Sequence, residues 1–175
     1  MKVERLTLVL VLFFVTFFRT YGKNDLPTVT DTTMAEESPI IFLDPSAYLV
    51  DSIVDFAMQL LGTPYVPAGC GVDGFDCSGL VNFVFNRYGI KVPRISREFE
   101  HFGTEIPIEE AQKGDVLLFL SSTKNVINHV GIITEPKGIE SQFIHAASGR
   151  DRQVRISTVS TKGYTWRVAK VIRVF

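Results

Sequence analysis

One cysteine and two histidines are the residues of this chain whose types and settings could support covalent chemistry. Cys77 stands in the first turn of a predicted helix, where unpaired amides and the positive end of the helix dipole stabilise a thiolate. We therefore expect a thiol that ionises without a strong neighbouring base. His129 and His145 lie at strand-like apolar runs, where His129 would carry the proton and His145 would orient its ring. These residues predict a cysteine hydrolase.

Two helices are expected ahead of the strands, and the second one positions Cys77. The first begins after Asp44 and stops before Gly62, with apolar residues recurring on one face. Asp76 can cap the second helix, and Gly89 sits where a left-handed residue ends a helix.

Five apolar runs separated by turn residues predict strands, at residues 115–120, 129–134, 142–147, 154–159 and 168–174. Two helices followed by a series of strands indicate an α+β fold with an antiparallel sheet. Alternation along the second run places His129 and Gly131 on one face of the sheet and Val130 and Ile132 on the other.

The first 43 residues have the composition of a leader and a tether. Residues 1–22 combine basic residues, an apolar stretch and a small-residue end, which is typical of a signal peptide. Arg19 is atypical just before the cleavage site, so an uncleaved membrane anchor is the alternative. Residues 23–43 are polar and lack a periodic pattern, which predicts a flexible linker ahead of one folded domain at residues 44–175.

The charge of the mature chain argues against a polyanionic partner. Loss of residues 1–22 takes away three of the 18 basic and one of the 19 acidic residues, which leaves a net charge near −3. Such a chain has no general attraction for nucleic acid or for an anionic membrane surface. We expect a monomer, with membrane association only if the leader is not cleaved.

Six short motifs along the predicted domain resemble those of the NlpC family of papain-like cell-wall peptidases. They are Gly62-Thr63-Pro64-Tyr65, Asp76-Cys77-Ser78-Gly79-Leu80-Val81, Pro93-Arg94-Ile95-Ser96, Gly114-Asp115-Val116, His129-Val130-Gly131-Ile132 and Ile144-His145-Ala146. The resemblance implies N-terminal helices packed on an antiparallel sheet of five to six strands. It also implies a secreted or periplasmic enzyme that cleaves peptidoglycan stem peptides at the γ-D-glutamyl-diamino acid bond through a thioester, without metal or cofactor.

The resemblance also assigns roles to individual residues. Cys77 matches the nucleophile, His129 the base and His145 the third member of the triad. Tyr65 matches a tyrosine whose hydroxyl faces the nucleophile and helps to hold the substrate or the oxyanion. The residues after Tyr65 depart from the family pattern, which implies an altered subsite there.

Four further residues match the substrate-binding positions of the family. Asp76 and Ser78 resemble residues that bind the free amino terminus of a stem peptide in some members. Arg94 and Ser96 match a loop in the wall of the cleft. Outside the resemblance, Asp76 is explained by helix capping alone, and Arg94 by a solvated loop.

Other interpretations of the same residues stay open. Cys70 and Cys77 could form a disulfide in an oxidising compartment, which would silence the thiol. His129 and His145 could be hydrogen-bonded core residues, and together with Cys77 they could bind zinc, although no closely spaced ligand pair supports a metal site. His101 is expected at the surface.

Two other classes of function and one misleading motif complete the alternatives. The domain could be an inactive wall-binding module, or a papain-like amidase or acyltransferase that acts on another substrate. Residues 69–74 fit the dinucleotide-binding pattern G-x-G-x-x-G, but prolines interrupt any preceding strand and no βαβ unit follows.

Overall fold

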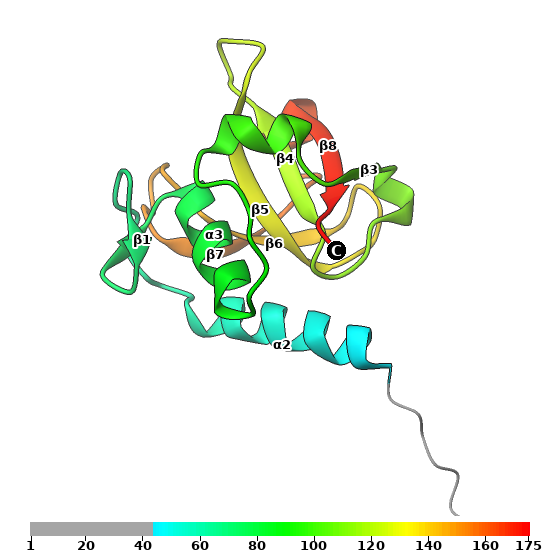
Figure 1. Cartoon of the computed structure of the whole chain (residues 1–175). Helices are drawn as coiled ribbons and strands as arrows, with labels where there is room; N and C mark the ends of the chain where they lie inside the picture. Colours follow the sequence, from blue (N-terminus) through cyan, green and yellow to red (C-terminus); the bar gives the residue numbers. More distant parts are fainter. Residues whose placement is uncertain (1–43) are drawn as a thin grey trace, which may run out of the picture. The chain divides into compact units, whose positions relative to one another are not determined.

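A computed structural model of the protein describes residues 44–175 and shows the predicted α+β architecture, with two helices packed on a six-stranded antiparallel sheet (Figure 1). The predicted signal peptide at 1–22 and linker at 23–43 lie outside the described residues. Within residues 44–175 no helix is both long and apolar enough to cross a membrane.

Both helices begin at an aspartate cap, which was predicted for Asp76. Helix α2 spans Pro45–Gln59, and the Asp44 carboxylate accepts a hydrogen bond from the Ser46 amide. Helix α3 spans Cys77–Arg87, and the Asp76 carboxylate accepts from the Gly79 amide at 2.6 Å. Gly89 follows α3 with a φ of 76°, the left-handed conformation that ends a helix.

The sheet has the strand order β3-β8-β4-β5-β6-β7, and every neighbouring pair is antiparallel. Its strands are β3 Thr104–Ile106, β4 Val116–Leu120, β5 Ile127–Glu135, β6 Gln142–Ala146, β7 Val154–Thr158 and β8 Val168–Arg173. The five predicted strands correspond to β4 to β8, with ends that differ by one or two residues.

Several short elements were not predicted from the sequence. Strands β1 (Cys70–Gly71) and β2 (Gly74–Phe75) form a small hairpin just before α3, and β3 adds an edge strand to the main sheet. Three 3₁₀ helices were also missed: η1 Ser96–His101, η2 Ile108–Glu110 and η3 Thr165–Arg167.

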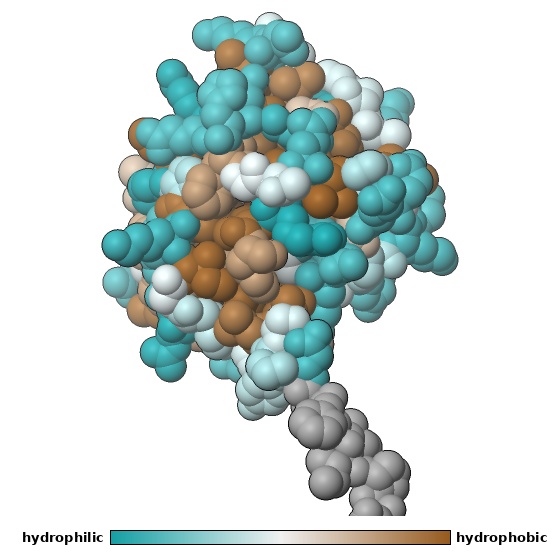
Figure 2. All heavy atoms as spheres, turned by 45° about the vertical axis from the view of Figure 1, so that its right-hand side comes forward, coloured by the Kyte–Doolittle hydropathy of each residue, from teal (hydrophilic) through white to brown (hydrophobic). Residues whose placement is uncertain are grey.

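The two faces of the sheet bury different sets of side chains. Val130 and Ile132 belong to the main core together with Leu80 and Val84 of α3, so the helices cover this face. The opposite face carries a second buried cluster, to which Phe119 of β4 belongs. Figure 2 shows that, on the outer surface in that view, hydrophilic side chains surround an apolar area.

A register shift lies in β5 next to the predicted base. Phe119 pairs with His129, but Leu120 pairs with Ile127, so Asn128 is an extra residue in β5. Such a β-bulge bends a strand and changes the direction of its side chains. The bulge therefore bends β5 directly before His129 and changes the direction of the side chains there.

Candidate active site

Cys77 lies at the start of α3, against the main chain of the bulged end of β5. Its sulfur is 3.7 Å from the Asn128 carbonyl oxygen, and the residue is 8% exposed. Antiparallel pairing puts β5 in the middle of the sheet, and the packing of α3 on β5 brings the helix start to it. The thiol is thus fixed beside the residue that precedes His129.

The thiol lines a cavity of about 510 Å³, which we call the nucleophile cavity. Its other lining residues include all five of the predicted substrate-binding residues, namely Tyr65, Asp76, Ser78, Arg94 and Ser96. Asn128 and Ile95 also line it, although the sequence did not single them out. The structure therefore brings together side chains from α3, the loops around it and β5.

Burial works against the expected thiolate. It raises the pKa of Cys77, while the amide of Val130 and those at the helix start lower the pKa by less, and the nearby Asp76 charge raises it further. The resting thiol is consequently neutral at pH 7. The expectation that helix position alone would ionise Cys77 is wrong, and its reaction requires a base.

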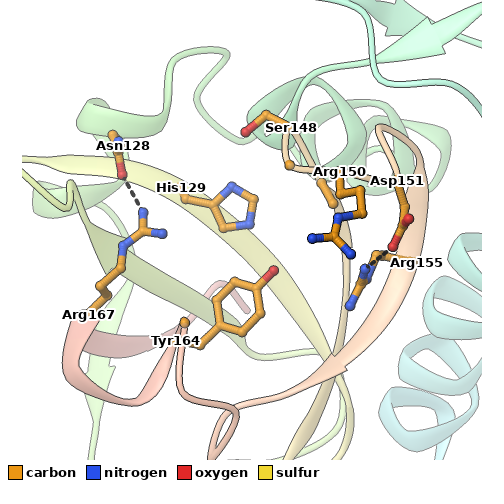
Figure 3. A pocket seen from close by; sticks show the side chains of 11 residues that line it. Asn128, His129, Ser148, Arg150, Asp151, Arg155, Tyr164 and Arg167 are labelled. Carbon is orange, nitrogen blue, oxygen red and sulfur yellow. Dashed lines mark hydrogen bonds and ion pairs between the residues drawn. The ribbon is translucent and has the colours of Figure 1, made fainter.

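The two predicted histidines are in direct contact. Nε2 of His129 is 2.9 Å from Nδ1 of His145, and the two rings are nearly perpendicular, at 89°. Figure 3 shows His129 at the edge of a second cavity, separate from the nucleophile cavity. Because His145 occupies Nε2, Nδ1 is the ring nitrogen of His129 that is left for another partner. His145 is fully buried.

Two unpredicted residues hold the other end of His145. The Ser157 hydroxyl lies 3.0 Å from its Nε2, and the Tyr164 hydroxyl lies 3.3 Å from the same atom. If His145 donates from Nε2, its Nδ1 accepts from Nε2–H of His129, and Nδ1 of His129 is left as an unprotonated base. This tautomer is the one that a proton-accepting His129 needs.

Both imidazoles are neutral at pH 7. Burial, and then the positive charge of Arg167, lower the pKa of His129 to about 4. Burial, followed by His129 and Arg155, also holds the pKa of His145 well below its usual range. A buried pair of neutral imidazoles can accept a proton but does not carry a resting charge.

Alternation along β5 is as predicted and places the imidazoles on the face of the sheet opposite α3. The His129 ring contacts Phe119 and Tyr164, with ring centroids 5.7 and 6.3 Å away. Gly131 is required beside them, since a Cβ there would come within 2.6 Å of Phe143. The thiol thus approaches β5 at the end of the strand, where Asn128 borders both the nucleophile cavity and the cavity that His129 lines.

Arg94 is bound to the start of α3 and is not the solvated loop residue that the sequence alone allows. Its guanidinium contacts both oxygens of Asp76 at 3.0 Å and donates to the Ala68 carbonyl at 2.7 Å. Ser78 also donates to Asp76, at 3.2 Å. The Asp76 carboxylate therefore caps the helix and neutralises Arg94, so that a substrate amine would have to share it.

Tyr65 is half-buried at the rim of the nucleophile cavity. Burial raises the pKa of Tyr65, and the negative charges that Cys77 and Asp76 can carry raise it further, so the hydroxyl remains a hydrogen-bond donor. The Arg152 guanidinium lies over the ring, 5.2 Å from its centroid. The Tyr65 amide donates to the Arg152 carbonyl at 2.8 Å, which fixes this segment.

The structure decides one of the alternatives. Cys70 and Cys77 are both free, so the alternative of a disulfide between them is wrong; the Cys70 thiol lies 3.7 Å from the Gly79 carbonyl. His101 is exposed, as predicted. Among residues 44–175, no group of three or more histidine, cysteine or acidic side chains is placed to hold a metal ion.

Comparison with known proteins agrees with the motifs. A family model described as the NlpC/P60 family matches residues 62–173. The chain belongs to the NlpC/P60 family. A Bacillus cereus relative named gamma-D-glutamyl-L-lysine dipeptidyl-peptidase is 30% identical over 150 residues, which are 85% of this chain and 37% of the relative. The chain therefore spans well under half of that relative's length.

Solved structures of the family share the fold of the NlpC/P60 chain. An NlpC/P60 family protein from Bacillus cereus has a TM-score of 0.65 at 30% identity, over 71% of this chain and 40% of that chain. The NlpC/P60 domain of the peptidoglycan hydrolase SagA has a TM-score of 0.59 at 29% identity, over 71% of this chain and 97% of that domain. The papain-like fold is thus shared with an isolated domain of similar extent.

Proposed function

We propose that this NlpC/P60 protein is a secreted cysteine endopeptidase that hydrolyses peptidoglycan stem peptides, at the bond between γ-D-glutamate and the following diamino acid. The observation that carries the proposal is the nucleophile cavity, in which Cys77 lies among five side chains suited to bind a peptide. The family, and a relative named for the γ-D-glutamyl-L-lysine bond, support the substrate class. The signal-like residues 1–22 support secretion.

In the proposed reaction His129 acts as a general base. Nδ1 of His129 takes the proton of the neutral Cys77 thiol as the sulfur attacks the peptide carbonyl carbon. The Tyr65 hydroxyl and a backbone amide at the start of α3 donate to the oxyanion. The imidazolium then protonates the leaving amine, which departs and leaves a thioester, and water activated by His129 hydrolyses the thioester.

We also propose that the enzyme prefers stem peptides with a free amino terminus. Asp76 and Ser78 both line the nucleophile cavity, beside Cys77. A free alanyl amine would bind at their oxygens while Arg94 keeps the Asp76 carboxylate in place. Equal rates on intact sacculi and on free stem peptides would contradict this preference.

Digestion of defined muropeptides tests the proposed function directly. The protein should convert L-alanyl-γ-D-glutamyl-diamino acid peptides into the L-alanyl-D-glutamate dipeptide and a diamino acid fragment, as identified by mass spectrometry. Cleavage at another bond would reassign the specificity. Binding of the peptides without any product would support the alternative of a wall-binding module.

A further inference from the structure

A second cavity lies on the His129 side of Asn128. It has a volume of about 320 Å³, and three arginines with a single aspartate contribute to its lining. We call it the arginine cavity; its charged residues are Arg150, Asp151, Arg155 and Arg167. Figure 3 shows these side chains around the open space in front of His129 and Tyr164.

The positive charges in the arginine cavity are only partly compensated. Arg155 pairs with Asp151 at 2.7 Å, which uses the one carboxylate. Arg167 donates to the Asn128 side-chain oxygen at 2.9 Å and to the Leu120 carbonyl at 2.6 Å, and neither acceptor carries a charge. Three guanidinium groups against one carboxylate leave two uncompensated positive charges in the cavity.

Arg150 is the arginine that is free to bind a ligand. Its side chain is exposed, and within residues 44–175 it forms no ion pair and no side-chain hydrogen bond. In Figure 3 its guanidinium is turned toward the space between the rings of His129 and Tyr164. A planar guanidinium with unused donors is suited to bind a carboxylate in a bidentate manner.

In the proposed reaction, the leaving half of the substrate lies on the side of Asn128 where the arginine cavity is. Cys77, Tyr65 and Asp76 border the nucleophile cavity, where the acyl half would bind. His129 lines the arginine cavity and would protonate the leaving amine, so the diamino acid must lie beside His129. The leaving half therefore meets two uncompensated positive charges.

We propose, on the basis of this proposed function, that the arginine cavity selects a leaving group that carries a carboxylate, with Arg150 as its main ligand. The carboxylate is either that of a diaminopimelate side chain or that of the peptide's C-terminus. The side chain of L-lysine ends in an ammonium group alone, whereas that of diaminopimelate carries a carboxylate beside its ammonium group, so only the latter offers the arginines an opposite charge. The relative named for γ-D-glutamyl-L-lysine thus need not share this preference.

Four matched tripeptides test the proposal: L-alanyl-γ-D-glutamyl peptides that end in meso-diaminopimelate or L-lysine, each with a free or an amidated C-terminus. We expect wild-type kcat/KM to favour a carboxylate-bearing leaving group about tenfold, and Arg150→Gln to remove that ratio. Arg87→Gln is the matched control and should keep the ratio, because Arg87 is the last residue of α3 and lies over the Phe56 ring of α2.

The pattern across the peptides identifies the source of the carboxylate. A preference for diaminopimelate that survives amidation assigns the side-chain carboxylate, and loss of rate upon amidation of both peptides assigns the C-terminus. Equal rates on all four peptides, or a ratio that Arg150→Gln leaves intact, would overturn the proposal.

A binding measurement separates this proposal from the proposed function. Calorimetric titration with the dipeptides meso-diaminopimelyl-D-alanine and L-lysyl-D-alanine needs no turnover. If the protein cleaves nothing, the proposed function fails, yet tighter binding of the diaminopimelyl dipeptide that is lost in Arg150→Gln would still support the subsite. Weaker binding of both dipeptides in Arg150→Gln would support it with the C-terminus as the ligand, and binding of both that Arg150→Gln leaves unchanged would overturn it.

Discussion

Tyr65 tests the proposed chemistry at the scale of a single atom. Tyr65→Phe removes only the hydroxyl that would donate to the oxyanion, and loss of one such donor costs about 10²- to 10³-fold in rate. We expect kcat to fall by that factor while the unfolding midpoint changes little. Steady-state kinetics on a stem tripeptide measure the effect, and an unchanged kcat would remove Tyr65 from the reaction.

Arg167 tests the protonation state of His129. Since His129 must be neutral to accept the thiol proton, its pKa of about 4 sets the acidic limb of kcat/KM well below the ordinary histidine value. The positive charge of Arg167 disfavours the imidazolium, so Arg167→Gln should move the acidic limb to higher pH, by about one unit or less.

The pH profiles of wild type and Arg167→Gln on one peptide give this shift, because substrate titration cancels in the comparison. Arg87→Gln serves as a distant control. A limb that stays near pH 6.5 in the wild type, or that moves to lower pH in Arg167→Gln, would contradict the assignment of His129 as a buried neutral base.

At the scale of elements, β5 requires a glycine where it passes β6. A Cβ at residue 131 would lie 2.6 Å from the Phe143 ring, 3.0 Å from the Ile144 carbonyl oxygen and 3.2 Å from the His145 Cβ. Gly131→Ala should therefore destabilise the protein by about 1–3 kcal/mol. It should also lower activity, because the collision displaces His145.

Gly163→Ala is the control for this substitution, since a Cβ there meets no atom within 4 Å. Urea unfolding of both variants gives the free energies, and Gly163→Ala should stay within about 0.5 kcal/mol of the wild type. Equal stabilities of the two variants would show that β5 and β6 can separate without cost at this point.

The longer elements could be predicted from sequence because their signals are local. Asp44 and Asp76 are caps next to apolar periodic segments, and Gly89 has the conformation that ends a helix. The two-residue strands of the β1–β2 hairpin and the three-residue β3 are too short to show a period. They exist because they pair with each other or with β8.

Residue types and motifs could predict the main residues of the candidate site, but not the contacts that depend on how the strands pair. The chain pattern predicted Cys77, His129 and His145 as catalytic residues, and the two histidines are in contact. Ser157 contacts His145 only because β6 and β7 pair in register, and no local signal marks it. The bulge at Asn128 likewise depends on how β4 and β5 align, and the raised pKa of Cys77 depends on burial by the whole fold.

At the scale of the whole molecule, the buried histidines link stability to pH. In the unfolded chain His129 takes up a proton as the pH falls through about 6.5, whereas in the fold it stays neutral down to about 4. The unfolded state then binds more protons, so stability is full above pH 6.5 and falls as the pH drops to 4. For His129 alone the loss is about 3 kcal/mol.

Urea unfolding at pH 7 and at pH 4.5 checks this linkage. The wild type should lose stability between the two pH values, and His129→Gln should lose less, because glutamine does not titrate. The same loss in both proteins would mean that His129 is not buried in a neutral form.

The central claim, that Cys77 is the nucleophile, is tested most directly by titrating the thiol in a Cys70→Ser background, where one cysteine remains. Iodoacetamide is added in steps, and intact mass and hydrolysis of the L-alanyl-γ-D-glutamyl-meso-diaminopimelate peptide are followed together. We predict that activity falls in proportion to single alkylation at Cys77 and that Cys77→Ala, folded as judged by its unfolding midpoint, yields no product. Hydrolysis that persists after complete alkylation, or in Cys77→Ala, would contradict the account.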